Sequence, residues 1–498
     1  MFSPSLEEVK EIGKNEEYRR IPISYELFSD IATPIEVLRI LKGVSNHVYM
    51  LESVEDSQKW GRYSFLGFNP LLEFTCQNGI VKIRGDRNFE RLTDEEVTIE
   101  TDNPSEIIKE LVLKNKSPKL EYLPPFTGGF VGYFAYDYIK YSEPSLNLDA
   151  ENQDQFKDID LMLFDKVIAF DNFKQKIILI ANMKTDDLEN NYQKACDELK
   201  EIAELIKNGK KTEIEPLKLK SDFKPVFSRE RFCNMIDKAK DYIYEGDIFQ
   251  VVLSNRIEAE ITGSLFDTYR VLRTTNPSPY MFYFSSDDIE IAGASPETLV
   301  KLTDNQLYTF PLAGTRPRGK TEEEDLALEE ELLSDEKELA EHNMLVDLGR
   351  NDIGRISEIG SVHVDKYLSI ERFSHVMHIG STVSGTLRSD LDSLSAIDSI
   401  LPAGTLSGAP KIRACEIINE LEDNKRGIYG GAIGYVDLSG NIDTCISIRI
   451  AFARNNKVFI RSGAGIVADS VPDNEFDECL NKAAAVINAL KIADGGLE

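Results

Sequence analysis

SDEKELAEHNMLVDLGRNDIGR, at residues 334–355, reads as a helix whose inward face carries acids. Asp335 is placed to cap its N-terminus, with Glu338 three residues later in the capping-box position. At helical spacing Glu338 and Glu341 lie on one stripe with Leu345, so two carboxylates occupy the face that should point inward. Two acids in that position repel each other and are costly to desolvate unless a cation or a proton compensates them.

A second acidic pair follows near the C-terminus, in DSVPDNEFDECLNKAAAVINAL at residues 469–490. Asp473 is a candidate N-cap, and Glu475, Glu478 and Lys482 follow on one face of the predicted helix. If the two helices face one another, four carboxylates converge, and hard oxygen ligands of that kind suit Mg²⁺. The alternative is a solvated acidic face, which is common in a chain with 86 Asp and Glu residues.

Composition sets the outer limits. A chain of 498 residues exceeds the usual size of one domain, so we expect two or three structural units. The formal net charge of -29 argues against a nucleic-acid partner, because affinity for the phosphate backbone depends largely on Lys and Arg. No apolar run approaches a membrane span, and the acidic N-terminus does not resemble a signal peptide. We therefore expect a cytoplasmic protein with no membrane association.

Short strands with glycine turns alternate with amphipathic helices along most of the chain, a pattern typical of antiparallel sheet. Residues 209–227 are different, because they combine Lys, Pro and Gly with little apolar periodicity and read as a linker. The sequence thus predicts an N-terminal region at residues 1–208 and a C-terminal region at residues 228–498.

One predicted strand, at residues 442–452, has apolar even positions and mostly polar odd positions. Arg449 is an odd position, so its side chain should point away from the hydrophobic layer. An arginine in the middle of a strand is usually exposed to solvent. The alternative is that it lines a cleft and binds a carboxylate.

Two glycine-rich turns, LPAGTLSGAPKIRA at residues 401–414 and RSGAGIVAD at residues 461–469, place small residues where backbone N–H groups can bind an anion. The lysine in GTLSGAPK does not follow the P-loop spacing, so nucleotide binding is disfavoured. A cation site, an arginine, a lysine and two such turns together suit a small substrate with two carboxylates.

These segments resemble the large subunit, component I, of anthranilate synthase, within the chorismate-utilising enzymes. The resemblance covers nearly the whole chain and is densest over residues 228–490. It implies an α+β fold in which two large antiparallel β-sheets pack as a sandwich with helices on the outside. It also implies Mg²⁺-dependent conversion of chorismate and ammonia to anthranilate and pyruvate, the first committed step of tryptophan biosynthesis.

The resemblance implies that both acidic pairs serve the metal. Glu341 and Glu478 would bind Mg²⁺ directly, and Glu338 and Glu475 would hold metal-bound waters. The metal would bind the ring carboxylate of chorismate and stabilise charge that develops when the ring is attacked.

Catalytic and substrate-binding residues are implied in the same way. Glu297 of the ASPET motif would protonate the departing ring hydroxyl, which requires a raised pKa. His378 and Thr405 would lie near the substrate ring. The implied substrate-binding residues are Gln250, Gly314, Thr315, Tyr435, Arg449, Gly463, Ala464, Gly465 and Lys482.

Two positions distinguish branches of the family. Members that add water carry a lysine where this chain has Gln250, and the aminodeoxychorismate branch usually carries a lysine where this chain has Ala313. Both positions favour attack by ammonia and anthranilate as the product. The alternative enzyme is aminodeoxychorismate synthase component I. The alternative to an enzyme is a non-catalytic module that senses tryptophan.

MLES, at residues 50–53, resembles the LLES element of a tryptophan feedback site, whose other side would be NPSPYMF at residues 276–282. The N-terminal region would therefore be regulatory, with L-tryptophan as an inhibitor. The implied tryptophan-binding residues are Glu52, Ser53, Pro279, Tyr280, Met281 and Phe282.

The six cysteines are scattered, with no CxxC pair, which favours buried thiols in a reducing compartment; they are Cys76, Cys196, Cys233, Cys415, Cys445 and Cys479. None lies in the tight glycine turn that a glutamine amidotransferase nucleophile requires. The chain should therefore use free ammonia alone, and glutamine only with a separate amidotransferase subunit, component II.

Overall fold

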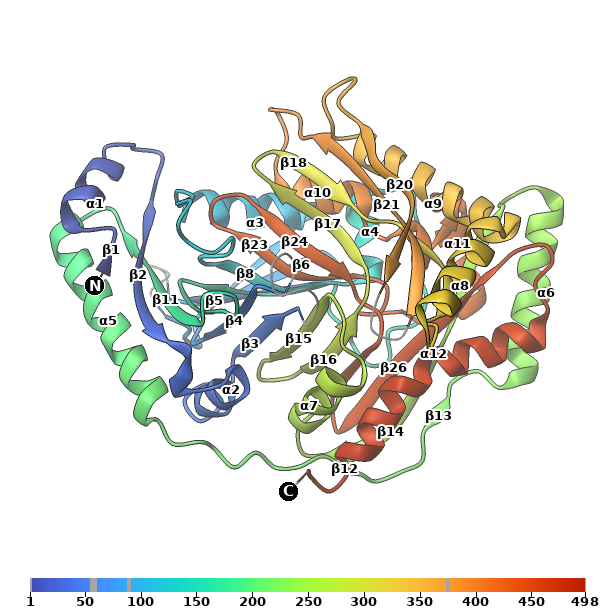
Figure 1. Cartoon of the computed structure of the whole chain (residues 1–498), viewed down its shortest axis with the longest axis horizontal. Helices are drawn as coiled ribbons and strands as arrows, with labels where there is room; N and C mark the ends of the chain where they lie inside the picture. The colour runs from blue at the N-terminus through green and yellow to red at the C-terminus, as the bar shows by residue number, and fades with distance from the viewer. Residues whose placement is uncertain (1, 54–60, 87–90, 373–375, 498) are drawn as a thin grey trace.

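The computed structural model describes residues 2–53, 61–86, 91–372 and 376–497. Two large antiparallel sheets lie against each other, and helices cover their outer faces (Figure 1). The predicted α+β class with two large antiparallel sheets is confirmed. None of the helices in the described ranges combines the length and apolar character that a membrane crossing requires.

The first sheet contains 14 strands. Its main path runs in the order β1 (Phe2–Ser3), β2 (Arg20–Phe28), β11 (Lys176–Lys184), β10 (Lys166–Asp171), β4 (Tyr63–Phe68), β3 (Val48–Glu52), β15 (Tyr280–Ser285), β16 (Glu290–Ser295), β25 (Ile450–Arg454), β26 (Lys457–Ile466), β14 (Gln250–Thr262) and β12 (Lys218–Leu219). Strand β14 also pairs with β13 (Lys224–Pro225) and β22 (Gly408–Ala409).

The second sheet contains 12 strands. Its order is β19 (Leu312–Pro317), β21 (Val376–Thr386), β18 (Gln306–Thr309), β17 (Thr298–Thr303), β24 (Ile442–Ile446), β23 (Ala432–Asp437), β8 (Gly129–Phe134), β9 (Ile159–Phe164), β5 (Leu72–Gln77), β6 (Ile80–Gly85) and β7 (Glu96–Glu100), with β20 (His363–Arg372) paired to β21.

The helices divide between the two outer faces. Those on the side of the first sheet are α1 (Leu6–Ile12), α2 (Pro34–Leu41), α5 (Leu188–Asn208), α6 (Arg229–Glu245), α7 (Phe266–Thr275), α11 (Lys411–Glu422) and α12 (Pro472–Ala493). Those on the side of the second sheet are α3 (Pro104–Leu113), α4 (Ile139–Ser142), α8 (Glu322–Ser334), α9 (Glu336–Gly354) and α10 (Ser393–Ile400). Three short 3₁₀ turns complete the list: η1 (Ser29–Ile31), η2 (Tyr136–Tyr138) and η3 (Gly404–Leu406).

Strand β10 shows why these segments form a central layer. Val167 and Ala169 face the core between the two sheets, whereas Ile168 and Phe170 face the helices outside the first sheet. Successive side chains of a strand point to opposite faces, so a strand buried on both faces must be apolar throughout. Apolar residues therefore pack on both sides of this sheet.

Each sheet takes strands from both sides of residues 209–227. In the first sheet β3 pairs with β15, and in the second sheet β8 pairs with β23. The connecting segment itself runs along the lower edge of the molecule between α5 and α6, and contributes β12 and β13 to the first sheet (Figure 1). The predicted boundary divides the sequence, but the sheets continue across it.

Candidate active site

Helix α9 begins as expected, after Asp335, whose carboxylate accepts hydrogen bonds from the N–H groups of Lys337 and Glu338. The side chain of Glu338 does not return to this cap. It lies instead 3.5 Å from the guanidinium of Arg316 on β19. The two acids of α9 are thus placed near its N-terminal end, on the side of the second sheet.

Helix α12 begins two residues earlier than expected. Its first residue is Pro472 and its N-cap position is Val471, so the prediction of Asp473 as the N-cap is wrong. Proline suits the first helical position because its fixed φ is already helical and no N–H is lost there. Asp473 pairs with Arg229 of α6, at 3.0 Å.

The acidic faces of α9 and α12 act on each other. Burial raises the pKa of Glu341, and the neighbouring carboxylates of Glu338 and Glu478 raise it further. Burial also raises the pKa of Glu475, with Glu478 adding to the effect. Glu341 remains exposed to solvent, so it does not lie in the core. Carboxylates from both helices therefore share a region with too little compensating positive charge.

Arg449 lies where the chain passes from one sheet to the other. The predicted continuous strand is interrupted, because β24 belongs to the second sheet and β25 to the first. Between them Arg449 adopts a φ of 53°, in the left-handed region that residues with a side chain rarely use. Backbone strain of this kind is concentrated at functional sites. The alternation in the sequence correctly separated Arg449 from the apolar positions but did not reveal the change of sheet.

A cleft of about 570 Å³ opens beside Arg449; Asn276, Glu478, Asn481 and Lys482 also line it. Lys482 lies 2.6 Å from Glu478 and donates a 3.3 Å hydrogen bond to the carbonyl oxygen of Gly463. The predicted arginine, lysine and glycine-rich segment therefore meet in one place. The prediction of a turn at Gly463–Gly465 is wrong, however, because these residues lie within β26 and pair with β14. An arginine and a lysine at one cleft provide the charge that binds a carboxylate.

Gln250 and Gly465 also belong to this group. Strand β14 pairs with β26, and a Cβ added at Gly465 would lie 2.6 Å from the side-chain amide nitrogen of Gln250. Glycine at this position is therefore required for the close approach of the Gln250 side chain. Ala464 lies between the two glycines of β26, on the face that packs into the core below α6 and α11.

Tyr435 is not brought to this group. It lies in the aromatic core between the sheets, with its ring stacked on Phe126 at a centroid distance of 4.3 Å. Tyr429 takes the expected place, since a Cβ added at Gly463 would lie 3.1 Å from its hydroxyl. Sequence reasoning missed Tyr429; its position just before the Gly430-Gly431 pair was the available signal.

Glu297 lies between β16 and β17, and its carboxyl oxygen accepts a 3.3 Å hydrogen bond from the hydroxyl of Thr405. Burial raises the pKa of Glu297 to about 8, against the opposing effects of Thr405 and Arg449. A carboxyl of this kind is protonated at neutral pH, which suits a general acid. Burial is the cause that raises this pKa, and the acidic pairs of α9 and α12 do not contribute to it.

His378 on β21 faces β19. Its Nδ1 lies 2.9 Å from the carbonyl oxygen of Gly314 and 3.1 Å from the hydroxyl of Thr315. Burial lowers the pKa of His378, which favours the neutral imidazole. Because a carbonyl only accepts, Nδ1 is the protonated nitrogen and Nε2 carries the lone pair. Gly314 has a φ of 62°, so this contact also depends on a glycine.

The residues expected to bind tryptophan lie on neighbouring strands, with Glu52 of β3 directly opposite Met281 of β15. They divide between two faces, however. Met281 faces the outer helices, whereas Tyr280 and Phe282 face the core between the sheets. The period of two in a strand separates residues that are adjacent in sequence. Only part of the expected set can therefore line one pocket beside Glu52.

Glu52 already has two partners on α7. Its carboxylate accepts a 2.6 Å hydrogen bond from the hydroxyl of Tyr269 and pairs with the guanidinium of Arg273. Next to it, the hydroxyl of Ser53 is buried and has no hydrogen-bond partner among the residues that the structure describes. A buried polar atom without a partner is costly and indicates a place for a ligand.

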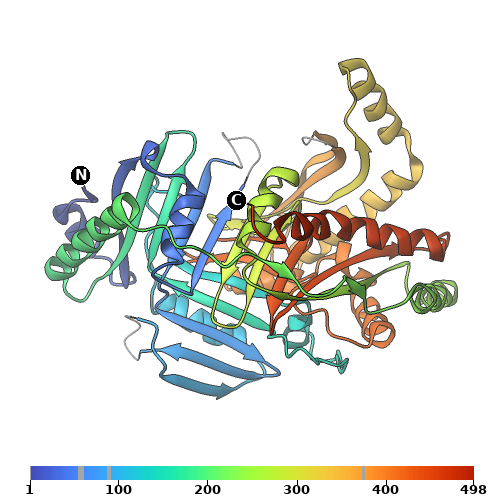
Figure 2. The same cartoon turned by 90° about the horizontal axis from the view of Figure 1, so that it is seen from below.

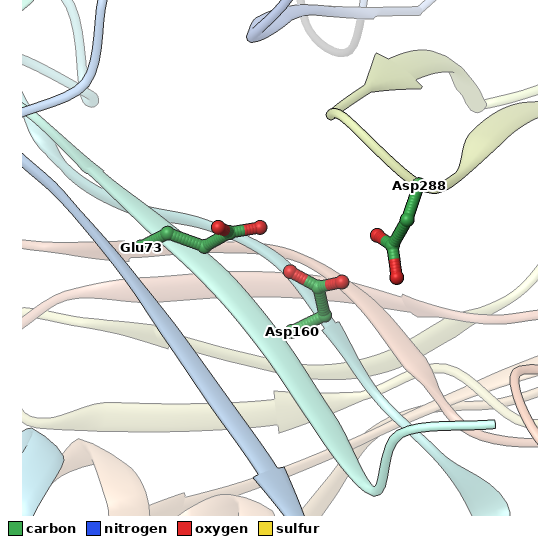
Figure 3. Close-up of side chains that lie close together, drawn as sticks. All are labelled: Glu73, Asp160 and Asp288. Atoms are coloured by element: carbon green, nitrogen blue, oxygen red, sulfur yellow. The ribbon is translucent and has the colours of Figure 1, made fainter. Parts of the chain in front are cut away.

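A different acidic group lies between the sheets, where carboxylate oxygens of Glu73, Asp160 and Asp288 come within 4.8 Å of one another (Figure 3). Such a group could hold a metal ion. The ammonium of Lys157 is already there, 2.9 Å from Asp160, 3.1 Å from Asp288 and 4.0 Å from Glu73. A lysine cation thus supplies the charge that a metal would supply, and the group ties β5 and β9 to the β15–β16 turn. Among the described residues the acids of α9 and α12 do not approach one another as closely.

Comparison with known proteins gives consistent results. Residues 49–488 match the model of a family described as chorismate binding enzyme. Anthranilate synthase component 1 of Acetivibrio thermocellus is 46% identical over 99% of both chains, and that of Aquifex aeolicus is 45% identical over 99% of both chains. The crystal structure of anthranilate synthase component I from Streptococcus pneumoniae superposes with a TM-score of 0.75 at 38% identity, covering 92% of this chain and 98% of that one.

Proposed function

The chain belongs to the family of chorismate binding enzymes and has the lyase activity of anthranilate synthase, and we propose that the cleft beside Arg449 is where chorismate binds. One observation carries this proposal: Arg449 and Lys482 line one cleft, and Lys482 contacts Gly463 of the Gly463–Gly465 segment. The charge of Arg449 also acts on Glu297, whose pKa it lowers. Chorismate and a component II subunit are accordingly the expected substrate and partner.

The enolpyruvyl carboxylate binds to Arg449 and Lys482. Two cations within one cleft oppose a carboxylate directly. The left-handed backbone of Arg449 supports this role, because it turns the side chain out of the two sheets and into the cleft. Tyr429 replaces Tyr435 as the tyrosine beside this carboxylate, since its hydroxyl lies against Gly463.

The acids of α9 and α12 form the Mg²⁺ site, with Glu341 and Glu478 as direct ligands and Glu338 and Glu475 beyond them. These residues fit the ion, because all four donors are hard oxygens and their mutual repulsion raises the pKa of Glu341 and Glu475. When bound, Mg²⁺ would hold the ring carboxylate and stabilise negative charge on it.

Glu297 gives its proton to the ring hydroxyl, which leaves as water when neutral ammonia bonds to the ring. The resulting Glu297 carboxylate takes back the proton that the new ammonium nitrogen releases, so protons balance over this step. The enolpyruvyl group then leaves when a ring proton is removed: the ring C–O bond breaks, its electron pair leaves with the oxygen, and the C–H electron pair completes the aromatic ring. A proton added to the methylene carbon of the leaving enolate gives pyruvate. Neutral His378 is suited to receive the ring proton at Nε2, because its Nδ1–H is held by Gly314.

Ammonia, and not water, is the nucleophile because Gln250 stands where a lysine would be needed to deprotonate water. A side-chain amide is not a base near neutral pH and cannot take a proton from water, whereas ammonia needs no deprotonation before attack. The Gln250 amide lies against Gly465 of β26, two residues from Gly463, which Lys482 contacts.

Ammonia from glutamine requires the second subunit. Burial raises the pKa of all six cysteine thiols, so none is the reactive thiolate that a glutaminase needs.

L-tryptophan is the proposed inhibitor, bound beside Glu52 and Ser53. The buried hydroxyl of Ser53 without a partner supports a ligand there. Since Glu52 is paired with Arg273, a tryptophan ammonium must share or displace this pair. Tyr280 lies on the opposite face of β15 from this site, where it donates its hydroxyl to Asp443 and lies 2.9 Å from the hydroxyl of Thr298, the neighbour of Glu297.

The test is incubation of the purified chain with chorismate, ammonium and Mg²⁺, with anthranilate followed by its fluorescence and pyruvate by a coupled assay. Both products should form at equal rates. Aminodeoxychorismate synthase activity would consume chorismate without pyruvate or anthranilate, and a binding module would consume none. Glutamine in place of ammonium should give no product until component II is added, and robust activity without it would refute the assigned division of labour.

A further inference from the structure

The segment that carries Thr405, residues 401–410, connects α10 to α11 and contains only η3 and the two residues of β22. Little regular structure therefore fixes the hydroxyl that Glu297 depends on. Ser407 donates its hydroxyl to the carbonyl of Ala403 within the segment, and its own carbonyl accepts from the N–H of Val252. Side chains from outside must supply the rest of the restraint.

Lys411 holds one end of this segment. Its ammonium donates to the carbonyl oxygen of Ile400 at 2.9 Å and to the carboxylate of Asp352 on α9 at 2.8 Å. The side chains of Lys411 and Asp352 are 12% and 6% exposed, so this pair is shielded from water. A buried charge-assisted hydrogen bond of this kind restrains its partners more strongly than a surface ion pair.

Arg426 holds the other end. Its guanidinium donates to the carbonyl oxygens of Leu406 and Val252, each at 2.6 Å, and to the carboxylate of Glu422. Arg426 and Glu422 are each 1% exposed. Since Val252 is on the strand that begins with Gln250, this one side chain joins the Thr405 segment to the substrate side of β14.

The two cations thus donate to backbone carbonyls on either side of Thr405, at Ile400 and at Leu406. We propose that Lys411 and Arg426 are positioning residues that keep the Thr405 hydroxyl on the Glu297 carboxyl during the reaction. This inference rests on the proposed function, because it assumes that Glu297 is the general acid. Neither cation touches the cleft, so both act through Thr405.

The electrostatic surroundings of Glu297 make this role measurable. Arg449 of the β24–β25 connection and the Thr405 hydroxyl both lower its pKa. Asp352 of α9 lines the same small cavity as Glu297, but its charge is neutralised by Lys411. If Thr405 moves away, the pKa of Glu297 must rise, because the carboxylate loses a donor. If Lys411 is removed, the negative charge of Asp352 is no longer neutralised, and it also raises the pKa of Glu297.

The experiment compares the pH dependence of kcat/KM in Lys411→Met, Thr405→Val and the double variant, assayed with ammonium and Mg²⁺. Lys411→Met keeps the length of the side chain and removes the donor. It should lower kcat by about 10- to 100-fold with little change in KM, the cost of a small misplacement in an active site. Its basic limb should move to higher pH, as in Thr405→Val, and the double variant should lose less activity than the product of the two single losses.

Arg413→Met is the matched control. Arg413 lies two residues further along α11 and pairs with Asp247, but this pair is partly exposed and touches no part of the Thr405 segment. Its activity and pH profile should match the wild type. Activity of the wild type and of Arg413→Met tests the proposed function, whereas the shift in Lys411→Met tests this inference.

An unshifted basic limb in folded Lys411→Met, or fully multiplicative losses in the double variant, would overturn the proposal. Circular dichroism and thermal unfolding establish that each variant is folded. Should Lys411→Met not fold, Lys411→Arg keeps the cation but displaces the Ile400 carbonyl with a larger group. It should give a smaller shift of the same sign, and a wild-type profile for Lys411→Arg would then be the contrary result.

Discussion

Thr405 and Glu297 are 108 residues apart in sequence, yet the threonine hydroxyl lies 3.3 Å from the glutamate carboxyl. With the pKa of Glu297 raised to about 8, the acid form predominates at neutral pH and is lost as the pH rises through that value. We expect kcat/KM to fall above about pH 8 for this reason. Glu297→Gln should lower kcat by about 10²- to 10⁴-fold and abolish this limb. A pH-rate profile that stays flat to pH 10 would contradict the assignment.

Replacing the acids of α9 and α12 should weaken Mg²⁺ binding. Glu338→Gln and Glu475→Gln should raise the Mg²⁺ concentration for half-maximal activity by about 10- to 100-fold, and Glu341→Gln and Glu478→Gln by more. Titration calorimetry with Mg²⁺ gives the affinity independently of turnover. Glu336→Gln, an exposed acid in the first turn of α9, is the control and should behave as wild type. Full turnover in excess chelator would exclude a metal role.

Inhibition by tryptophan should depend on Glu52 and Ser53. Ser53→Phe fills the space around a buried hydroxyl that has no partner, and should abolish inhibition while leaving uninhibited activity within about 2-fold, because most substitutions away from a catalytic site are tolerated. Glu52→Gln should act similarly. The measurement is the tryptophan concentration that halves the activity. Glu26→Gln, at an exposed position on β2, is the control and should keep the sensitivity of the wild type. A Ser53→Phe enzyme as sensitive as wild type would count against the site.

Lys157→Met should destabilise the fold without touching the active site. Removing the ammonium leaves the buried Asp160 without its cation, whereas Arg84 still pairs with Glu73 and Arg454 still pairs with Asp288. The expected cost is about 2–4 kcal/mol in the free energy of unfolding, somewhat below that of a fully buried pair. Lys176→Met removes a surface pair with Glu26 and should cost about 0–1 kcal/mol. Urea unfolding measures the loss of unfolding free energy in both variants. Equal losses would show that Lys157 stabilises the fold no more than a surface ion pair does.

Arg449 allows a test of strain against function. Arg449→Gly and Arg449→Ala both remove the guanidinium, so both should raise KM for chorismate at least about 10-fold, as expected when one partner of a desolvated charge pair is lost. Their stabilities should differ. With φ at 53°, alanine should be less stable than glycine by about 1–2 kcal/mol. Thermal unfolding measures this difference, and alanine as stable as glycine would show that the backbone relaxes.

The helices that carry the acids were predictable because their signals are local. Caps, 3.6-residue periodicity and the contrast between acidic and apolar faces all lie within the quoted segments of α9 and α12. The N-cap of α12 was misassigned because aspartate is a strong cap former, whereas Pro472 occupies the first helical position and sets the start. The separate helix α8 has an N-cap at Thr321 but no apolar stripe, since its sequence is acidic on most faces.

What the sequence could not reveal was which strands lie side by side. Strand β24 and strand β25 continue one alternating pattern, yet they belong to different sheets. Alternation specifies which residues share a face but not which sheet receives them. Tyr435 was chosen over Tyr429 for the same reason, because both follow glycines near the right strand and only the three-dimensional fold separates them. The residue roles came from the family resemblance, whereas their contacts required coordinates.

The mixed origin of both sheets has a consequence for how this enzyme can be taken apart. A fragment beginning at residue 228 would present β15 and β23 as long unprotected edges, since their neighbours β3 and β8 would be missing (Figure 2). Such a fragment should aggregate through these edges instead of folding into an active enzyme. Because both sheets combine strands from residues 1–208 and 228–498, neither region should be exchangeable between relatives as a separate unit.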